Sequence, residues 1–174
     1  MEINKVLVIA DRKDDHTLIA LKRAAALLGG AKSASIHLRG FVHEGFVDKR
    51  GLLTKEEAEK YKTQMVKRRT DDLKQVIKAP QLTKLKVESE VVWQREIDKW
   101  VVSRSSKYDL IIKTGNRSES LWYMPTDWKL MRECLSPTYI VARKSWKKRS
   151  VVLATVDFDS RSNAQKALNK DVLA

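Results

Sequence analysis

The chain has 174 residues, of which 43% are hydrophobic and 33% are charged, enough for one soluble domain and a fragment of a second. Its formal net charge of +13 favours a nucleic acid, a membrane surface or an acidic partner. No apolar run approaches the roughly 20 residues that span a bilayer, and the single Cys134 excludes an internal disulfide. We expect a cytoplasmic protein with no signal peptide and no membrane contact.

Apolar runs and helical patterns alternate along the chain. The continuous apolar run from Lys5 to Ala10 is typical of a strand that is covered on both faces. Further strands are expected over 35–42, 84–93, 108–113 and 138–142, and helices over about 15–28, 54–78, 97–101 and 126–134. Gly29-Gly30 ends the first helix, and Thr54 with Glu57 forms a capping box for the second. This alternation predicts a parallel sheet with right-handed crossovers and helices on both faces.

After Lys148 the pattern begins again. Residues 151–157 repeat the form of residues 6–11, an apolar strand that ends in aspartate, and a polar turn and helix start follow both. This repetition predicts a tandem arrangement that is cut off in its second copy. The expected organisation is a first domain over 1–144, a basic linker over 145–149, and the strand and partial helix of a second domain over 150–174.

The sequence does not match several known metal-binding and catalytic motifs. Residues 29–33 resemble a P-loop in composition, but they follow a helix and precede a strand, which is the reverse of what phosphate capture requires. Residues 157–163 lack the glycine of a calcium loop, and no G-x-S-x-G elbow offers a serine nucleophile. One cysteine cannot complete a zinc spacing with three dispersed histidines, His16, His37 and His43. We expect no metal.

Basic and aromatic side chains raise a nucleic-acid interpretation that their distribution does not favour. Lys67-Arg68-Arg69 lies in a helix rich in both charge signs, which is typical of a solvated face, and the basic residues of 143–149 are typical of a solvated linker. Trp93 and Trp100 are expected in the core or at its rim rather than stacked on bases. We expect no specific nucleic acid and negligible affinity near physiological salt, with polyanion binding as a secondary hypothesis.

Ligands of open parallel sheets bind beyond the carboxyl ends of the strands, where the strand order reverses. Asp11 follows the first expected strand, Val42 and His43 end the second, and Thr114-Gly115 follows the fourth. The loop that begins at Thr114 therefore starts where a ligand is expected. This loop continues with bulky side chains and without another glycine, which favours a closed site over an open one.

The segment MPTDWKLMRECLSPTYIV, residues 124–141, carries a resemblance. Together with the five-strand pattern, the aspartate after the first strand and the long capped second helix, it is similar to a universal stress protein. Pro125 to Trp128 and Ser136-Pro137 resemble the tandem, E-type members more narrowly. The resemblance implies a UspA-like domain with an open five-stranded parallel sheet in the order 3-2-1-4-5, Rossmann-like and adenine nucleotide alpha hydrolase-like. It also implies a homodimer through the fifth strand, or pairing with a second domain.

Nucleotide-binding members of that family carry G-x2-G-x9-G-[S/T] after the fourth strand, because glycines let backbone amides approach phosphates. In that motif only Gly115 is retained here, since Ser118 replaces the second glycine and Met124-Pro125-Thr126 replaces the helix entry. The resemblance implies that Asp11 contacts the nucleoside, and Arg117 offers a side-chain contact to phosphate. The candidate binding residues are Asp11, Val42, Thr114, Gly115, Arg117, Ser118 and Thr126.

These residues favour a stress-response domain that is a non-catalytic binding and interaction module with a degraded nucleotide site. Such a site needs no resident cofactor and allows weak ATP binding. One alternative is an ATP-binding stress protein that hydrolyses ATP slowly with Asp11, Thr114, Gly115 and Ser118. Another is a polyanion-binding protein. A small molecule less polar than ATP is also compatible with a bulky, apolar crevice.

Overall fold

A computed structural model describes residues 3–29, 34–49, 51–82, 85–115 and 125–142. The chain divides into two units, residues 1–143 and residues 144–174, and the described residues all belong to the first. The expected linker over 145–149 and the expected strand and partial helix over 150–174 lie outside the described residues.

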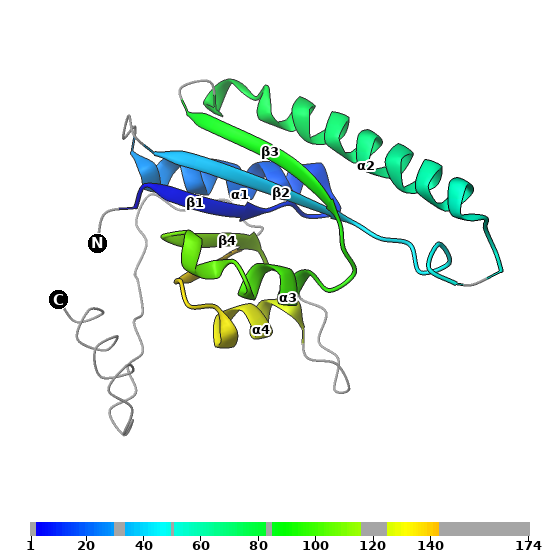
Figure 1. The fold of residues 1–174 in the computed structure, drawn as a ribbon. Coiled ribbons are helices and arrows are strands. Elements are labelled where there is room, and N and C mark those ends of the chain that lie inside the picture. The colour runs from blue at the N-terminus through cyan, green and yellow to red at the C-terminus, as the bar shows by residue number, and fades with distance from the viewer. Residues whose placement is uncertain (1–2, 30–33, 50, 83–84, 116–124, 143–174) are drawn as a thin grey trace, which may run out of the picture. The chain divides into compact units, whose positions relative to one another are not determined.

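Strands and helices alternate through the described residues as the sequence predicts (Figure 1). Each predicted bound lies within two residues of the observed one. The elements are β1 (Lys5–Ile9), α1 (Asp14–Leu28), β2 (Ser35–Val42), α2 (Lys55–Ile77), β3 (Lys86–Trp93), α3 (Ile97–Val102), β4 (Leu110–Thr114), α4 (Thr126–Glu133) and β5 (Thr138–Val141), with short 3-10 turns at Pro80–Leu82 and Ser105–Lys107.

The five strands form one parallel sheet in the order β3-β2-β1-β4-β5. This order confirms the predicted topology and places the reversal of strand order between β1 and β4. Alternate residues of β1 point to opposite faces, so Val6 and Val8 pack beneath α1 and α2, whereas Leu7 and Ile9 pack beneath α3 and α4 (Figure 1). The sheet is therefore covered on both faces, as continuous apolar strands require.

The buried stripe of α1 differs from the expected one. The sequence favours Leu18, Leu21, Ala25 and Leu28; Leu21 and Leu28 are buried as expected, and the other buried residues are Thr17, Ala20 and Ala24. The small side chains Ala20 and Ala24 let the helix approach the sheet closely, and Leu18 and Ala25 lie at the rim of this core. Gly29 ends the helix with a φ of 53°, the left-handed conformation that glycine adopts without strain.

Helix α2 is long and mostly exposed. The sequence predicts that Ala58, Tyr61, Met65, Leu73 and Val76 face inward; Leu73 is fully buried, and the other four are half-buried. Its acidic and basic residues interleave along the exposed side. No helix of the described residues has the length and apolar character needed to cross a membrane.

The capping box at the start of α2 gives the first testable prediction. The Glu57 amide donates to Thr54 Oγ1 at 3.2 Å, and the Thr54 amide donates to the Glu57 carboxylate at 2.8 Å. Thr54→Ala is expected to lower the free energy of unfolding by about 1 kcal/mol, measured by urea denaturation. Thr63→Ala in the same helix is the control, because the Thr63 hydroxyl only bonds back to the Glu59 carbonyl. Equal losses in the two variants would contradict this role for the cap.

Polar contacts hold α4 against α3 and the turn after it. The Lys129 ammonium donates to the Asp98 carboxylate at 2.7 Å, and the Ser136 hydroxyl donates to the Tyr108 carbonyl at 2.6 Å. Burial tends to raise the pKa of Asp98, but hydrogen bonds from Lys129 and from backbone amides outweigh it, so this pKa lies below its ordinary value. These contacts join the middle of α4 to α3, and the residues after α4 to the segment before β4.

Candidate functional site

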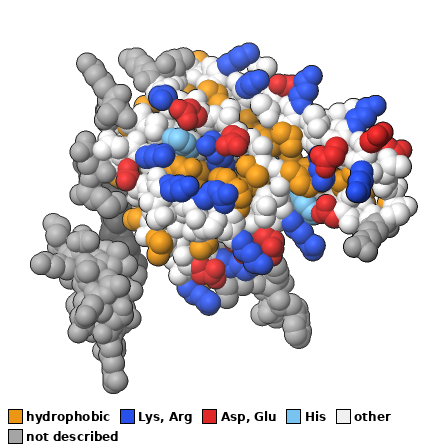
Figure 2. All heavy atoms as spheres, viewed as in Figure 1, with side chains coloured by type: hydrophobic (Ala, Val, Ile, Leu, Met, Phe, Trp, Pro, Cys, Tyr) orange, Lys and Arg blue, Asp and Glu red, His pale blue; other side chains and the backbone are white. Residues whose placement is uncertain are grey.

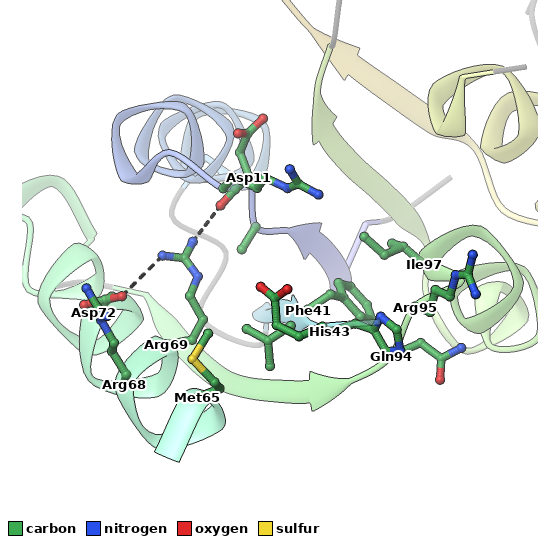
Figure 3. Close-up of a pocket in the computed structure, with 14 residues that line it drawn as sticks. Asp11, Phe41, His43, Met65, Arg68, Arg69, Asp72, Gln94, Arg95 and Ile97 are labelled. Carbon is green, nitrogen blue, oxygen red and sulfur yellow. Dashed lines mark hydrogen bonds and ion pairs between the residues drawn. The ribbon is translucent and has the colours of Figure 1, made fainter. Parts of the chain in front are cut away.

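A cavity of about 610 Å³ opens at the carboxyl ends of the strands (Figure 3). Its lining comes from the residues after β1, the end of β2, one side of α2 and the turn from β3 into α3. Asp11 and Val42 both line it, so the structure unites two of the candidate residues. The cavity lies where the parallel strands end, which is the expected place for a ligand in this architecture.

The segment that carries Asp11 is held in one conformation by local hydrogen bonds. The Asp11 amide donates to Thr17 Oγ1 at 3.0 Å, and the Lys13 amide donates to Asp11 Oδ1 at 3.1 Å. His16 Nδ1 lies 3.5 Å from the same oxygen, and the Asp11 side chain is 11% exposed. Asp11 is therefore fixed in one conformation at the cavity wall, with its carboxylate beside the start of α1.

Arg69 links α2 to the segment after β1. Its guanidinium donates to the Asp11 carbonyl at 2.6 Å and to the Asp14 carboxylate at 2.7 Å, and it lies 3.7 Å from the Asp72 carboxylate. Figure 3 shows the Arg69 side chain reaching from α2 across to the Asp11 backbone. Arg69 thus forms a wall of the cavity.

The expectation of a solvated face for Lys67-Arg68-Arg69 is wrong for Arg69, which is largely buried and paired with acidic groups. Arg68 also lines the cavity, while Lys67 is exposed. The sequence did hold a signal for this: Met65, Arg69 and Asp72 recur at spacings of four and three residues, which places them on one side of a helix.

The candidate residues after β4 have different surroundings. Thr114 is fully buried, and its hydroxyl donates to the His16 carbonyl at 2.8 Å. The Gly115 amide donates to the Val141 carbonyl at 2.9 Å, continuing the β4–β5 pairing. Thr126 begins α4 and is half-buried, after an N-cap proline that has no N–H to offer. None of these three described residues lines the cavity.

The space beside Gly115 is occupied by side chains. A Cβ on Gly115 would lie 2.9 Å from Ile140 Cγ2 and 3.9 Å from Asp127 Oδ2. The Asp127 carboxylate in turn lies 2.7 Å from the Lys113 ammonium, and both side chains are about nine-tenths buried. This buried ion pair at the junction of β4 and α4 was missed by sequence reasoning. Arg117 and Ser118, with the bulky loop residues up to Met124, lie outside the described residues.

No protein-family model matches the chain. Universal stress protein E of Escherichia coli K12 is 27% identical over 178 residues, covering 98% of this chain and 54% of that protein. The Universal stress protein E homolog of Haemophilus influenzae is 23% identical over 183 residues, covering 99% of this chain and 58% of that protein. The chain therefore spans about half the length of these curated relatives.

Two solved structures share the fold of this chain. The hypothetical protein MJ0577 superposes with a TM-score of 0.65 at 16% identity, covering 84% of this chain and 100% of that one. A universal stress protein in complex with cAMP gives a TM-score of 0.52 at 15% identity, covering 83% of this chain and 100% of that one. The described residues have a UspA-like fold, and the chain is similar to Universal stress protein E over nearly its whole length. The resemblance read from residues 124–141 and the strand pattern is thereby confirmed.

Two rings in the cavity wall, Phe41 and His43, are each packed against a tryptophan. Phe41 lines the cavity and packs edge-on against Trp100 at 5.2 Å between ring centroids. His43 also lines it, lies 5.5 Å from the Trp93 ring and is paired with Asp48 at 2.6 Å. Trp93 and Trp100 are both half-buried, which confirms the expectation that they belong to the core or its rim.

The charged surface of the UspA-like domain is mixed. Figure 2 shows Lys and Arg side chains interspersed with Asp and Glu across the viewed face. Within the described residues, no group of three His, Cys, Asp or Glu side chains is arranged to hold a metal ion. Trp128 on α4 is 64% exposed, whereas Trp122 and Trp146 lie outside the described residues.

Proposed function

We propose that this UspA-like domain is a non-catalytic binding module that holds the nucleoside end of a mononucleotide in its cavity. The contrast between the two halves of the strand-end region carries the proposal. The half with Asp11 and Val42 is an open cavity, whereas the half with Thr114 and Gly115 has its polar groups engaged within the fold. The universal stress protein solved with cAMP supports a mononucleotide as the ligand class.

The chemistry of the cavity suits a nucleoside. Phe41, Met65 and Ile97 provide apolar surface for a base, as ligand pockets generally do. The Asp11 carboxylate accepts hydrogen bonds, which matches the hydroxyl donors of a ribose. Its fixed conformation lowers the ordering cost of binding.

The engaged polar groups of Thr114 and Gly115 argue against tight binding and hydrolysis of a triphosphate. The Thr114 hydroxyl and the Gly115 amide would each have to leave a hydrogen bond within the fold before contacting a phosphate. Losing two such contacts, at about 1.5–3 kcal/mol each, weakens binding by roughly 10²–10⁴-fold. ATP is therefore a weak ligand, and slow hydrolysis is not the function that we propose.

We further propose that the domain works in the cytoplasm as the first of two in a stress-response protein. The relatives named Universal stress protein E are about twice as long as this chain, which supports domains over 1–144 and from 150 onward. Strand β5 is the edge of the described sheet next to β4, which favours pairing there with a second copy or with the second domain.

Asp11→Asn tests the proposed function. The substitution keeps Oδ1 as an acceptor for the Lys13 amide and removes the charge that a ribose hydroxyl would meet. It is expected to weaken AMP and cAMP binding by about 10–100-fold in isothermal titration calorimetry, which corresponds to the loss of one charged hydrogen bond.

Asp15→Asn is the matched control, because Asp15 is exposed in the first turn of α1 and does not line the cavity. It removes the same charge and is expected to leave both affinities unchanged. The proposal fails if the unmodified protein binds neither AMP nor cAMP, or if it binds Mg-ATP more tightly than AMP and turns it over.

A further inference from the structure

The ion pair between Lys113 and Asp127 lies beside the first turn of α4. Asp127 Oδ1 is 2.7 Å from Lys113 Nζ, and Asp127 Oδ2 is 3.9 Å from the point that a Cβ on Gly115 would occupy. The carboxylate therefore stands next to the one motif glycine that is retained after β4. Lys113 also donates to the Thr114 carbonyl at 3.0 Å, so its ammonium lies at the same turn.

A buried lysine at the end of a central strand requires a compensating anion. Lys113 and Asp127 are 8% and 7% exposed, and the Lys113 charge can be stabilised there only by nearby acceptors. The Asp127 carboxylate is this compensating anion. Because Asp127 lies in the first turn of α4, its negative charge also interacts favourably with the helix dipole.

The carboxylate thus has the two favourable interactions that a ligand phosphate would otherwise find at this turn. A phosphate placed beside Gly115 would meet the Asp127 carboxylate instead of a free cation, and the Lys113 ammonium at 2.7 Å only partly offsets the repulsion between the two anions. The repulsion grows with the charge of the ligand. A neutral nucleoside or a singly charged cyclic monophosphate meets little of it, and a triphosphate meets most.

We propose that Asp127, held by Lys113, is an internal substitute for a ligand phosphate and determines the class of ligand that the domain accepts. It favours nucleosides and mononucleotides and rejects nucleoside polyphosphates. This inference rests on the proposed function for the nucleoside cavity, but it assigns to the β4–α4 junction a role that the cavity alone does not give it.

Asp127→Asn tests the inference by removing the anion and releasing the Lys113 ammonium. The readout is the ratio of the dissociation constants of ATP and adenosine, measured by calorimetry at two salt concentrations. The ratio is expected to fall by roughly tenfold or more in the variant, and the gain in ATP affinity is expected to shrink at high salt. Glu133→Gln is the control, because Glu133 is exposed in the last turn of the same helix.

A second variant guards against loss of the fold. Lys113→Met with Asp127→Leu removes both charges, so it abolishes the repulsion without releasing a cation. For this double variant, the ratio of the ATP and adenosine dissociation constants is expected to lie between the ratio of the unmodified protein and that of Asp127→Asn. The inference is overturned if all three proteins discriminate equally between ATP and adenosine.

Tripolyphosphate separates this inference from the proposed function. It carries the phosphates without a nucleoside, so its binding does not depend on the cavity around Asp11. Asp127→Asn is expected to bind tripolyphosphate measurably and the unmodified protein is not. If adenosine fails to bind either protein while this gain is seen, the proposed function is wrong and the role of Asp127 stands. If the gain is missing, the role of Asp127 is wrong.

Discussion

Replacing Lys113 by methionine, or Asp127 by leucine, is expected to lower the free energy of unfolding by about 3–5 kcal/mol, because each single change breaks a buried ion pair. The two groups lie 2.7 Å apart with side chains that are 10% and 9% exposed. The double variant is expected to lie within about 1–2 kcal/mol of the unmodified protein, since apolar side chains of similar volume can replace a buried pair. Chemical denaturation of all four proteins gives the coupling free energy.

An exposed pair in α2 provides the matched comparison. Lys74 and Asp71 lie 3.8 Å apart on the helix surface, with side chains that are 63% and 56% exposed. Lys74→Met and Asp71→Leu are each expected to change the free energy of unfolding by about 0.5 kcal/mol or less. Similar coupling in the two cycles would show that burial does not strengthen the Lys113–Asp127 pair, and the structural basis of its proposed role would be lost.

The fold could be predicted from the sequence because its signals are local. Continuous apolar runs mark strands that are covered on both faces, and Gly29 and the Thr54–Glu57 box mark helix ends within a few residues. The strand order came from the resemblance of residues 124–141 and not from these patterns. The stripe of α1 was predicted only in part: Leu21 and Leu28 are buried as expected, whereas Ala20 and Ala24 are buried in place of Leu18 and Ala25.

The site was predicted only in part, because its decisive contacts join distant segments. Asp11 and Val42 follow from the rule that strands of a parallel sheet end at one edge. Arg69 and the Asp11 carbonyl are 58 residues apart in sequence. The helical spacing of Met65, Arg69 and Asp72 predicts that they share one side of α2, but it does not predict which segment that side contacts. Lys113 reads as a polar residue at a strand end, and only the packing of α4 on β4 shows that its partner is buried with it.

Gly40 in β2 connects the packing of α2 with the shape of the cavity. A Cβ at this position would lie 2.8 Å from Leu73 Cδ1, 3.2 Å from Val91 Cγ2 and 3.7 Å from Arg69 Cγ. The missing side chain therefore lets α2 lie close to the sheet, with Arg69 near enough to reach Asp11. A larger residue overlaps the buried Leu73 side chain, so either Leu73 repacks or α2 moves outward.

Gly40→Val is expected to lower the free energy of unfolding by about 1–3 kcal/mol through overpacking. It is also expected to weaken AMP binding, because displacement of α2 moves the Arg69 wall of the cavity. Gly45→Val is the control, since a Cβ on Gly45 meets no atom within 4 Å. Leu73→Ala makes room beside position 40, so the double variant with Gly40→Val is expected to lose less stability than the sum of the single changes. Additive losses, or equal losses at the two glycines, would mean that close packing at Gly40 does not set the position of α2.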